Sequence, residues 1–354
     1  MNRLVRAACL THYADVARQA GLDPVRQLLD AGLDPAVLQQ PDLLIPTERA
    51  SQLLETSARR SGVDTFGLRM AQSRQLSNLG PVGMLVRDQP TLRDSLQVLM
   101  RYQAAMNGAL AVLIDDQGEW SLVREELLAH RPQPLRQAIE LAVGVLFATM
   151  RQLLGPAWRP RRVCFTHAAP RSAAEHQQLF GVRAEFAQPF NGIICRTSDL
   201  DTRNPSADPL MARYAQQLLD ASPLAAAAAA DTLLDDVRRA ILLLLPSGRC
   251  TIEQVSAHLG LVCRTVQRRL ADQQQSFSGL VNALRVDLAR HHVAQGQRPL
   301  GDVAALLGFS ALSGFSRWHQ QQFGCSPSQA RAAAQPGMNT GVTSGLTTGA
   351  PAGP

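Results

Sequence analysis

One local plan occurs twice in the last third of this 354-residue chain: an apolar helical segment, a glycine, and a second helix with one polar face. In residues 251–270 the glycine is Gly260, and in residues 300–324 it is Gly308. Glycine readily adopts the left-handed backbone conformation that lets a chain reverse between two helices. The sequence therefore predicts two helix-turn-helix units.

The first unit has enough apolar positions to bury one side of each helix. Those of the first helix are Ile252, Val255, Ala257, Leu259 and Leu261. The second helix is expected over about residues 263–273, and Val266 and Leu270 share its inner face because residues four apart lie on one side of a helix. We therefore expect this second helix to expose its opposite face.

That opposite face carries the chemistry of base recognition. Arg264, Gln267 and Arg268 form a ridge at positions i, i+3 and i+4. In the major groove, arginine forms paired hydrogen bonds with guanine, and glutamine does so with adenine. Arg269 points away from this ridge, so we assign it to a phosphate contact.

The second unit repeats this plan. Its supporting helix contains the apolar residues Val303, Ala304, Leu306 and Leu307. In the helix expected over residues 311–323, Phe315 and Phe323 point inward. The outward positions, which are the candidates for DNA contact, are Ser313, Gly314 and Arg317.

A helical pattern over residues 276–295 separates the two units. At 1.5 Å per residue such a helix is about 30 Å long, which is close to the roughly 34 Å of one turn of B-DNA. The two exposed helices can therefore enter adjacent major grooves on one side of a duplex. This spacing predicts double-stranded DNA as a partner.

Over these roughly 100 residues the sequence resembles the AraC/XylS family of transcription regulators. The matching elements are Gly260, the run from Arg264 to Leu270, Phe277, Arg285, Ala289, the stretch Val303–Ser310, Phe315–Arg317 and Phe323–Pro327. The resemblance implies base-reading positions at Arg264, Gln267 and Arg268, and at Ser313, Gly314 and Arg317. It also implies a promoter site as the target, activation more than repression, and RNA polymerase as a further partner.

The sequence departs from the family pattern in three places, one of which spans two neighbouring residues. Val262 stands where a small hydroxyl residue usually caps the first recognition helix, and loss of such a cap costs about 1 kcal/mol. Trp318 and His319 replace a small residue and a phenylalanine, so the core of the second unit is altered. Leu312 replaces a polar residue that faces DNA. We therefore expect the second unit to contribute less to sequence reading than the first.

Ahead of these units, helical and strand-like segments alternate, which predicts an α+β domain. Residues 109–114 and 120–124 flank the turn sequence Asp115 to Gly118 and predict a hairpin. Residues 182–187 and 192–196 flank another turn sequence and predict a second hairpin.

Four parts of the chain follow from these patterns. They are an α+β domain over residues 1–220, an Ala-rich linker over 221–230, an all-α DNA-binding domain over 231–333 and a disordered tail over 335–354. The family resemblance implies that the domain over residues 1–220 is a ligand-sensing and dimerisation domain. The tail is rich in Gly, Thr and Pro and has no charged residue, so it has little to bury.

The N-terminal part is similar to the arabinose-binding-like sensor domain of ornithine-utilisation-type regulators. The supporting stretches are Gly21–Pro24, Leu79–Gly83, Thr91–Tyr102, Trp158–Pro160, Val163, Phe165, His167, Pro170 and Leu179–Gly181. This resemblance implies a small-molecule effector, such as an amino acid, an amine or an organic acid, and a possible homodimer. The candidate ligand-binding residues are Arg101, Tyr102, Trp120 and His167.

The charge distribution is consistent with a polyanionic partner. All 35 basic residues are arginines, and the net charge is +6. Residues 231–335 contain eleven arginines and seven acidic residues, which is a modest basic excess. A non-specific architectural DNA binder, which stays open as an alternative, would need a larger excess.

Composition and motifs point away from an enzyme, a metal site and a membrane. Six cysteines are dispersed without ligand spacing, so we expect no metal and no cofactor. A DNA-alkyl repair protein fused to this type of DNA-binding domain is the remaining enzyme alternative, and it would need clustered cysteines. The chain has no signal peptide and no segment that approaches 20 consecutive apolar residues, so we expect a cytoplasmic protein.

Overall fold

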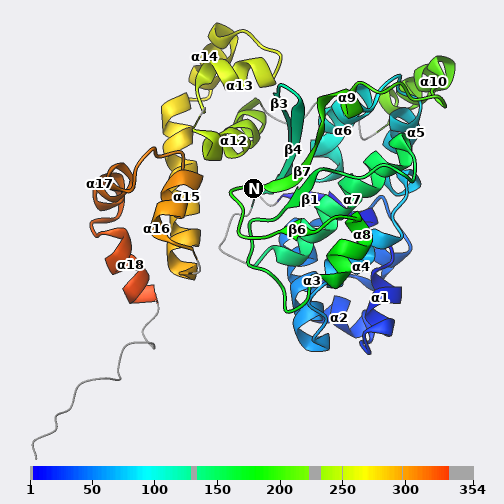
Figure 1. Ribbon diagram of the computed structural model, residues 1–354, viewed down its shortest axis with the longest axis horizontal. Helices are drawn as coiled ribbons and strands as arrows, with labels where there is room; N and C mark the ends of the chain where they lie inside the picture. Colours follow the sequence, from blue (N-terminus) through cyan, green and yellow to red (C-terminus); the bar gives the residue numbers. More distant parts are fainter. Residues whose placement is uncertain (1–2, 129–133, 223–232, 249, 297, 335–354) are drawn as a thin grey trace, which may run out of the picture.

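The computed structural model describes residues 3–128, 134–222, 233–248, 250–296 and 298–334. A mixed α/β domain is followed by a helical C-terminal region, and the two are in contact (Figure 1). Most of the expected linker, from residue 223 onward, and the whole expected disordered tail lie outside the described residues.

The N-terminal domain is mostly helical. Its helices are α1 (Tyr13–Gln19), α2 (Pro24–Asp30), α3 (Thr47–Ser61), α4 (Phe66–Gln72), α5 (Pro81–Arg87), α6 (Leu92–Met106), α7 (Arg136–Leu154), α8 (Ala174–Phe180), α9 (Thr197–Leu200) and α10 (Pro209–Asp220). Asp23, Thr91 and Asp208 cap α2, α6 and α10, because each side chain accepts a hydrogen bond from a backbone N–H of the first turn. Helix α10 packs on α5, so the chain remains with this domain up to that point.

A five-stranded sheet has the strand order β3-β4-β7-β5-β6. The strands are β3 (Leu110–Gln117), β4 (Trp120–Leu127), β5 (Arg162–Cys164), β6 (Ala184–Glu185) and β7 (Asn191–Arg196), and a separate antiparallel pair consists of β1 (Leu4–Arg6) and β2 (Leu44–Pro46). The first predicted hairpin is confirmed. Its strands are longer than expected, because Gln117 pairs with Trp120 and leaves only Gly118 and Glu119 for the turn.

The second predicted hairpin is wrong. Strand β7 pairs with β4 and β5, whereas β6 pairs in parallel with β5 and has no ladder with β7. The turn signal misled because Asn191 already belongs to β7, where it lies opposite Glu125. Its side-chain oxygen accepts a hydrogen bond from the backbone N–H of Thr166, which ties the start of β7 to the residues after β5.

Helix α7 lies at the centre of the N-terminal domain, where it contacts α3, α4 and the sheet. Val143, Phe147 and Met150 on this helix are fully buried. By length and composition alone, α7 is long and apolar enough to cross a membrane, although polar residues interrupt its apolar run. More than half of it is buried within the protein, which is the pattern of a core helix.

The two helix-turn-helix units are confirmed with close to the expected boundaries. The C-terminal helices are α12 (Leu233–Leu244), α13 (Ile252–His258), α14 (Cys263–Asp272), α15 (Phe277–Gln295), α16 (Leu300–Leu306), α17 (Leu312–Phe323) and α18 (Pro327–Ala334). Gly260 and Gly308 have φ of 64° and 72°, the left-handed conformation that the turns require. One expected core position is wrong: Ala257 is exposed, and Ser256 is buried in its place.

The altered core of the second unit is visible at α17. His319 is buried and its Nδ1 atom lies 2.8 Å from the carbonyl oxygen of Cys325. The indole N–H of Trp318 donates to the side-chain oxygen of Asn282 on α15 at 2.7 Å, and its ring stacks on Phe315. Both departures from the family pattern therefore hold α17 against the rest of the helical region.

Helix α12 connects the two parts of the molecule. Val237, Ala240 and Ile241 belong to the hydrophobic core of the first helix-turn-helix unit. Leu243 packs on Ala111 and Leu113 of β3, which point away from the α7 side of the sheet because side chains alternate along a strand. Figure 1 shows α12 between the sheet and the helices α13 and α15.

Candidate DNA interface and ligand pocket

The first recognition helix, α14, separates its apolar and polar faces as the sequence predicts. Val266 and Leu270 are buried against the core of the unit. Arg264, Gln267 and Arg268 are exposed on the other side. The helix therefore presents guanidinium and amide groups to the solvent on a rigid support.

The arginines of α14 are free of intramolecular partners. Across the residues that the structure describes, Arg264, Arg268 and Arg269 form neither an ion pair nor a side-chain hydrogen bond. In contrast, Arg285 on α15 donates to the carbonyl oxygen of Leu307 at 2.9 Å. The α14 guanidiniums are thus available to an external anion.

Helix α17 offers a smaller polar surface. Ser313 and Arg317 are exposed, and Gly314 is half-buried. Each recognition helix also begins with an exposed apolar side chain, since Val262 is 72% exposed and Leu312 is 45% exposed. Val262 has the extended backbone of an N-cap residue but gives α14 no side-chain cap.

The connecting helix α15 keeps the two recognition helices apart. Its 19 residues correspond to a length of about 28 Å. In Figure 1, α14 lies beyond the start of α15, and α17 lies beside its later part. The length of α15 is comparable with one turn of B-DNA, which is about 34 Å.

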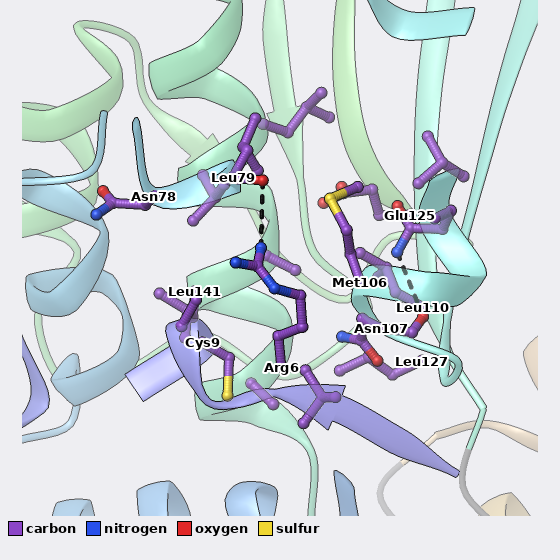
Figure 2. Close-up of a pocket in the computed structure, with 18 of the residues that line it drawn as sticks. Arg6, Cys9, Asn78, Leu79, Met106, Asn107, Leu110, Glu125, Leu127 and Leu141 are labelled. Atoms are coloured by element: carbon purple, nitrogen blue, oxygen red, sulfur yellow. Dashed lines mark hydrogen bonds between the residues drawn. The ribbon is translucent and has the colours of Figure 1, made fainter. Parts of the chain in front are cut away.

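A separate cavity of about 180 Å³ lies in the N-terminal domain, lined mainly by residues of α3, α6, α7, β1, β3 and β4. Most of its lining is apolar and includes Leu54, Leu96, Leu99, Met106, Leu141 and Val145. Figure 2 shows Arg6 in this pocket, with Met106 and Glu125 on one side and Asn78 and Leu79 on the other. A concave, mainly apolar cavity with a few polar groups is typical of a small-molecule site.

Three polar side chains of this pocket have buried atoms without a hydrogen-bond partner. They are the hydroxyl oxygen of Thr47, the Nε atom of Arg74 and the Oε2 atom of Glu125. Burial alone raises the pKa of Glu125 to about 8, so this carboxyl group is mostly protonated at neutral pH. Leaving buried polar atoms unpaired costs free energy that a bound molecule can recover.

None of the four predicted ligand-binding residues lines this pocket. Arg101 is exposed on α6. The neighbouring Tyr102 is buried, and its hydroxyl accepts a hydrogen bond from Gln216 of α10 at 2.7 Å. Trp120 lies at the start of β4 between the guanidiniums of Arg161 and Arg196. These positions do not converge on one site.

His167 lies elsewhere, at a cleft of about 790 Å³ between the N-terminal domain and α12 and α15. Its Nε2 atom is 3.3 Å from the buried carboxylate of Glu140, which also lies within 3.2 Å of His176 and 3.1 Å of Arg136. Burial lowers the pKa of His167. Within the described ranges no group of His, Cys, Asp and Glu side chains could hold a metal ion.

Three polar residues of the pocket are not among those predicted from the sequence to bind a ligand: Glu125, Arg74 and Thr47. Glu125 carried a usable signal, because it continues the alternation of Val123 and Leu127 on the inner face of β4. Arg74 follows α4 and gave no such signal, since its burial depends on distant segments of the chain.

Four of the six cysteines lie in an environment that disfavours a reactive thiolate. All six are free, and burial raises the pKa of Cys9 and Cys195 to about 12 and that of Cys164 and Cys250 to about 11. A thiol that accepts an alkyl group needs a lowered pKa. These four cysteines therefore do not support the alkyl-repair alternative.

A mixed α/β domain with an apolar pocket, joined to two helix-turn-helix units, defines a DNA-binding transcription regulator. Residues 21–204 match the family model described as the arabinose-binding domain of AraC transcription regulator, and residues 238–333 match a helix-turn-helix domain model. The chain belongs to the AraC family of transcription regulators.

The chain aligns with named relatives over nearly their whole length. The chain is 31% identical to the HTH-type transcriptional regulator VirS of Mycobacterium tuberculosis over 94% of this chain and 97% of that protein. It is 29% identical to the ornithine utilization regulator of Pseudomonas aeruginosa over 90% of this chain and 91% of that protein. The chain is also similar to the crystal structure of the transcriptional regulator CdpR from Pseudomonas aeruginosa, with 19% identity and a TM-score of 0.43. The alignment includes 89% of this chain and 96% of the CdpR chain.

Proposed function

We propose that this regulator reads a promoter site with α14 and α17 and that a small effector in the N-terminal pocket changes its affinity for that site. Arg264, Gln267 and Arg268 read bases in the first major groove, and Arg269 contacts phosphate. Ser313, Gly314 and Arg317 face the second groove, where Arg317 is the only charged group of the three.

The observation that carries this proposal is the pair of exposed, unpaired arginines on α14. Arg264 and Arg268 lie on one ridge, directly opposite the buried Val266. A rigid ridge of this kind favours sequence reading over a general attraction to phosphate, because paired contacts with guanine demand a fixed geometry. The modest basic excess of residues 231–335 is also consistent with sequence reading, because a general attraction to phosphate would need a larger excess.

Selection from random DNA tests the proposal with the full-length protein. Duplexes that the protein retains should share two short motifs with centres about one helical turn, or roughly 10 base pairs, apart. Their affinity should fall as salt rises, because phosphate contacts release counterions. Retained duplexes without a common motif would instead identify a non-specific architectural binder.

We also propose that the protein acts in the cytoplasm without a catalytic step and activates transcription through RNA polymerase. The support is its kinship with named transcription regulators. Transcription from a selected site with purified polymerase should increase when the regulator is added. A decrease would identify a repressor.

A further inference from the structure

We propose that the N-terminal pocket binds a compact apolar carboxylic acid that carries a second polar group, with its carboxylate at Arg74 and the second group at Glu125. This inference rests on the proposed function, since it names the class of effector that the sensor domain takes. The structural basis is the set of unpaired buried atoms of Thr47, Arg74 and Glu125, all of which line one apolar cavity.

Arg74 is a buried cation that lacks a carboxylate partner among the described residues. Its Nη1 atom donates to the carbonyl oxygen of Ala8 at 2.7 Å, and Nη2 donates to that of Cys9. These contacts fix the guanidinium but leave its charge without an opposite charge and its Nε–H without an acceptor. A buried charge is costly until it is paired, so a ligand carboxylate at this position would be stabilised.

Glu125 provides a different kind of contact. It is only 5% exposed, and no cationic side chain offsets its burial. The other ionisable side chains that line the pocket are Arg6, which is paired with Asp42, and Cys9 and Arg74. A protonated Glu125 can both donate and accept a hydrogen bond, so it suits a hydroxyl group of the ligand.

The size and polarity of the cavity restrict the body of the ligand. A cavity of roughly 150 Å³ accommodates benzene, and this one is about 180 Å³. The body is therefore a short chain or a ring, and its surface is apolar because the walls are mainly Leu, Val and Met. A polyhydroxylated sugar fits poorly, since most of its hydroxyl groups would be buried without partners.

Calorimetry with four probes of equal chain length tests this assignment on the full-length protein without DNA. The probes are octanoate, 8-hydroxyoctanoate, 1-octanol and octylamine. We expect 8-hydroxyoctanoate to bind most tightly, octanoate next, 1-octanol more weakly, and octylamine not at all because Arg74 repels it. Equal binding of octylamine and octanoate, or binding of none of the four, would overturn the proposal.

Substitutions locate the two contacts. Arg74→Gln should weaken octanoate and 8-hydroxyoctanoate alike by at least about tenfold, which corresponds to 1.4 kcal/mol. Arg101→Gln, which changes an exposed arginine of α6 outside the pocket, is the matched control and should change neither. A loss of binding in Arg101→Gln equal to that in Arg74→Gln would contradict the proposed site.

Because Arg74 also holds the backbone of Ala8 and Cys9, its substitution can disturb folding. Glu125→Leu avoids this difficulty, because its readout is a ratio measured on one folded protein. The preference for 8-hydroxyoctanoate over octanoate should disappear in this variant, and a retained preference would contradict the role of Glu125. Since binding is read without DNA, a failure here remains distinct from a failure of the DNA selection.

Discussion

The Nη1 atom of Arg124 lies 3.3 Å from the carbonyl oxygen of Leu243, and this hydrogen bond joins the sheet of the N-terminal domain to α12. Arg124 is the direct neighbour of Glu125 on β4, and successive side chains of a strand point to opposite faces. One face of β4 therefore borders the pocket, while the other holds the first helix of the DNA-binding region.

Replacing Arg124 should loosen this connection. Arg124→Met keeps the apolar stem but removes the donor to Leu243 and the ion pair with Asp115, whose atoms are 3.9 Å apart. The free energy of local opening of α12 should fall by about 1.5–3 kcal/mol, the usual range for a hydrogen bond with a charged partner. Hydrogen exchange of the α12 amides should accelerate accordingly.

Arg196→Met is the control for this substitution. It removes an arginine from the same sheet, but one that pairs with Glu119 at an exposed site. Exposed ion pairs contribute little to stability, so α12 exchange should be unchanged. Equal acceleration in both variants would show that α12 does not depend on Arg124.

Arg268→Ala should reduce sequence discrimination. The loss of one base-reading arginine should cost about 1–3 kcal/mol on a selected duplex and little on a scrambled one. Arg269→Ala should instead weaken both duplexes by similar amounts, since a phosphate contact carries no sequence information. Fluorescence anisotropy titrations at one salt concentration distinguish the two patterns, and identical behaviour of both variants would refute the assignment of roles.

Val262→Ser should stabilise α14. Val262 already has N-cap backbone geometry, with φ −76° and ψ 137°, but lacks an acceptor for the first-turn N–H groups. A serine there should add about 1 kcal/mol to the stability of the helix. Thr251→Ala, which removes the cap of α13, should have the opposite effect. Slower amide exchange in α14 of the first variant and faster exchange in α13 of the second are the expected results.

The stability of the protein should depend on pH through Glu125. Its pKa is about 8 in the folded protein and 4.5 ordinarily. Between these values the folded state keeps a proton that the unfolded chain releases, so the contribution of this group falls as pH rises and is lost above about pH 8.

The glutamine side chain in the Glu125→Gln variant cannot ionise, so the variant should not lose this contribution to folding stability as pH rises. The melting temperature of the variant relative to the wild type should rise from about pH 5 to about pH 8 and then level off. Glu126, whose pKa burial raises to about 7, titrates in the same range but is common to both proteins. The exposed Glu119→Gln serves as the control. A difference that stays constant with pH would contradict an unpaired, buried Glu125.

The recognition helices could be predicted from the sequence because their signals are local. Val266 and Leu270 are four residues apart, so they define the inner face of α14 without knowledge of any other segment. Gly260 and Gly308 mark the turns for a similar reason, since their conformation is a property of one residue. His319 lies four residues after Phe315 and four before Phe323, so its place in the core is also a matter of local spacing.

The pocket and the strand order could not be predicted, because they depend on contacts between distant segments. The strand expected over residues 120–124 ends one residue before Glu125, whereas pairing with β3 and β7 extends β4 to Leu127. Arg74 is buried only because the carbonyl groups of Ala8 and Cys9 approach it from the other end of the domain. Likewise, β5 separates β6 from β7 through pairings that no local turn signal records.

Helix α12 packs both on the sheet of the N-terminal domain and on the first helix-turn-helix unit. These two contacts determine where a chimaeric regulator can be joined. A chimaera joined between α12 and α13 would keep Leu243 on the sheet, but Val237, Ala240 and Ile241 of the original α12 would then have to pack on helices α13, α14 and α15 from another protein. A junction before Leu233 would transfer the whole DNA-binding region, from α12 to α18, from the other protein. Only the contact of β3 and β4 with the new α12 would then have to form between parts of different origin. Natural exchange of operator specificity among such regulators is therefore expected to preserve α12 together with the units that follow it.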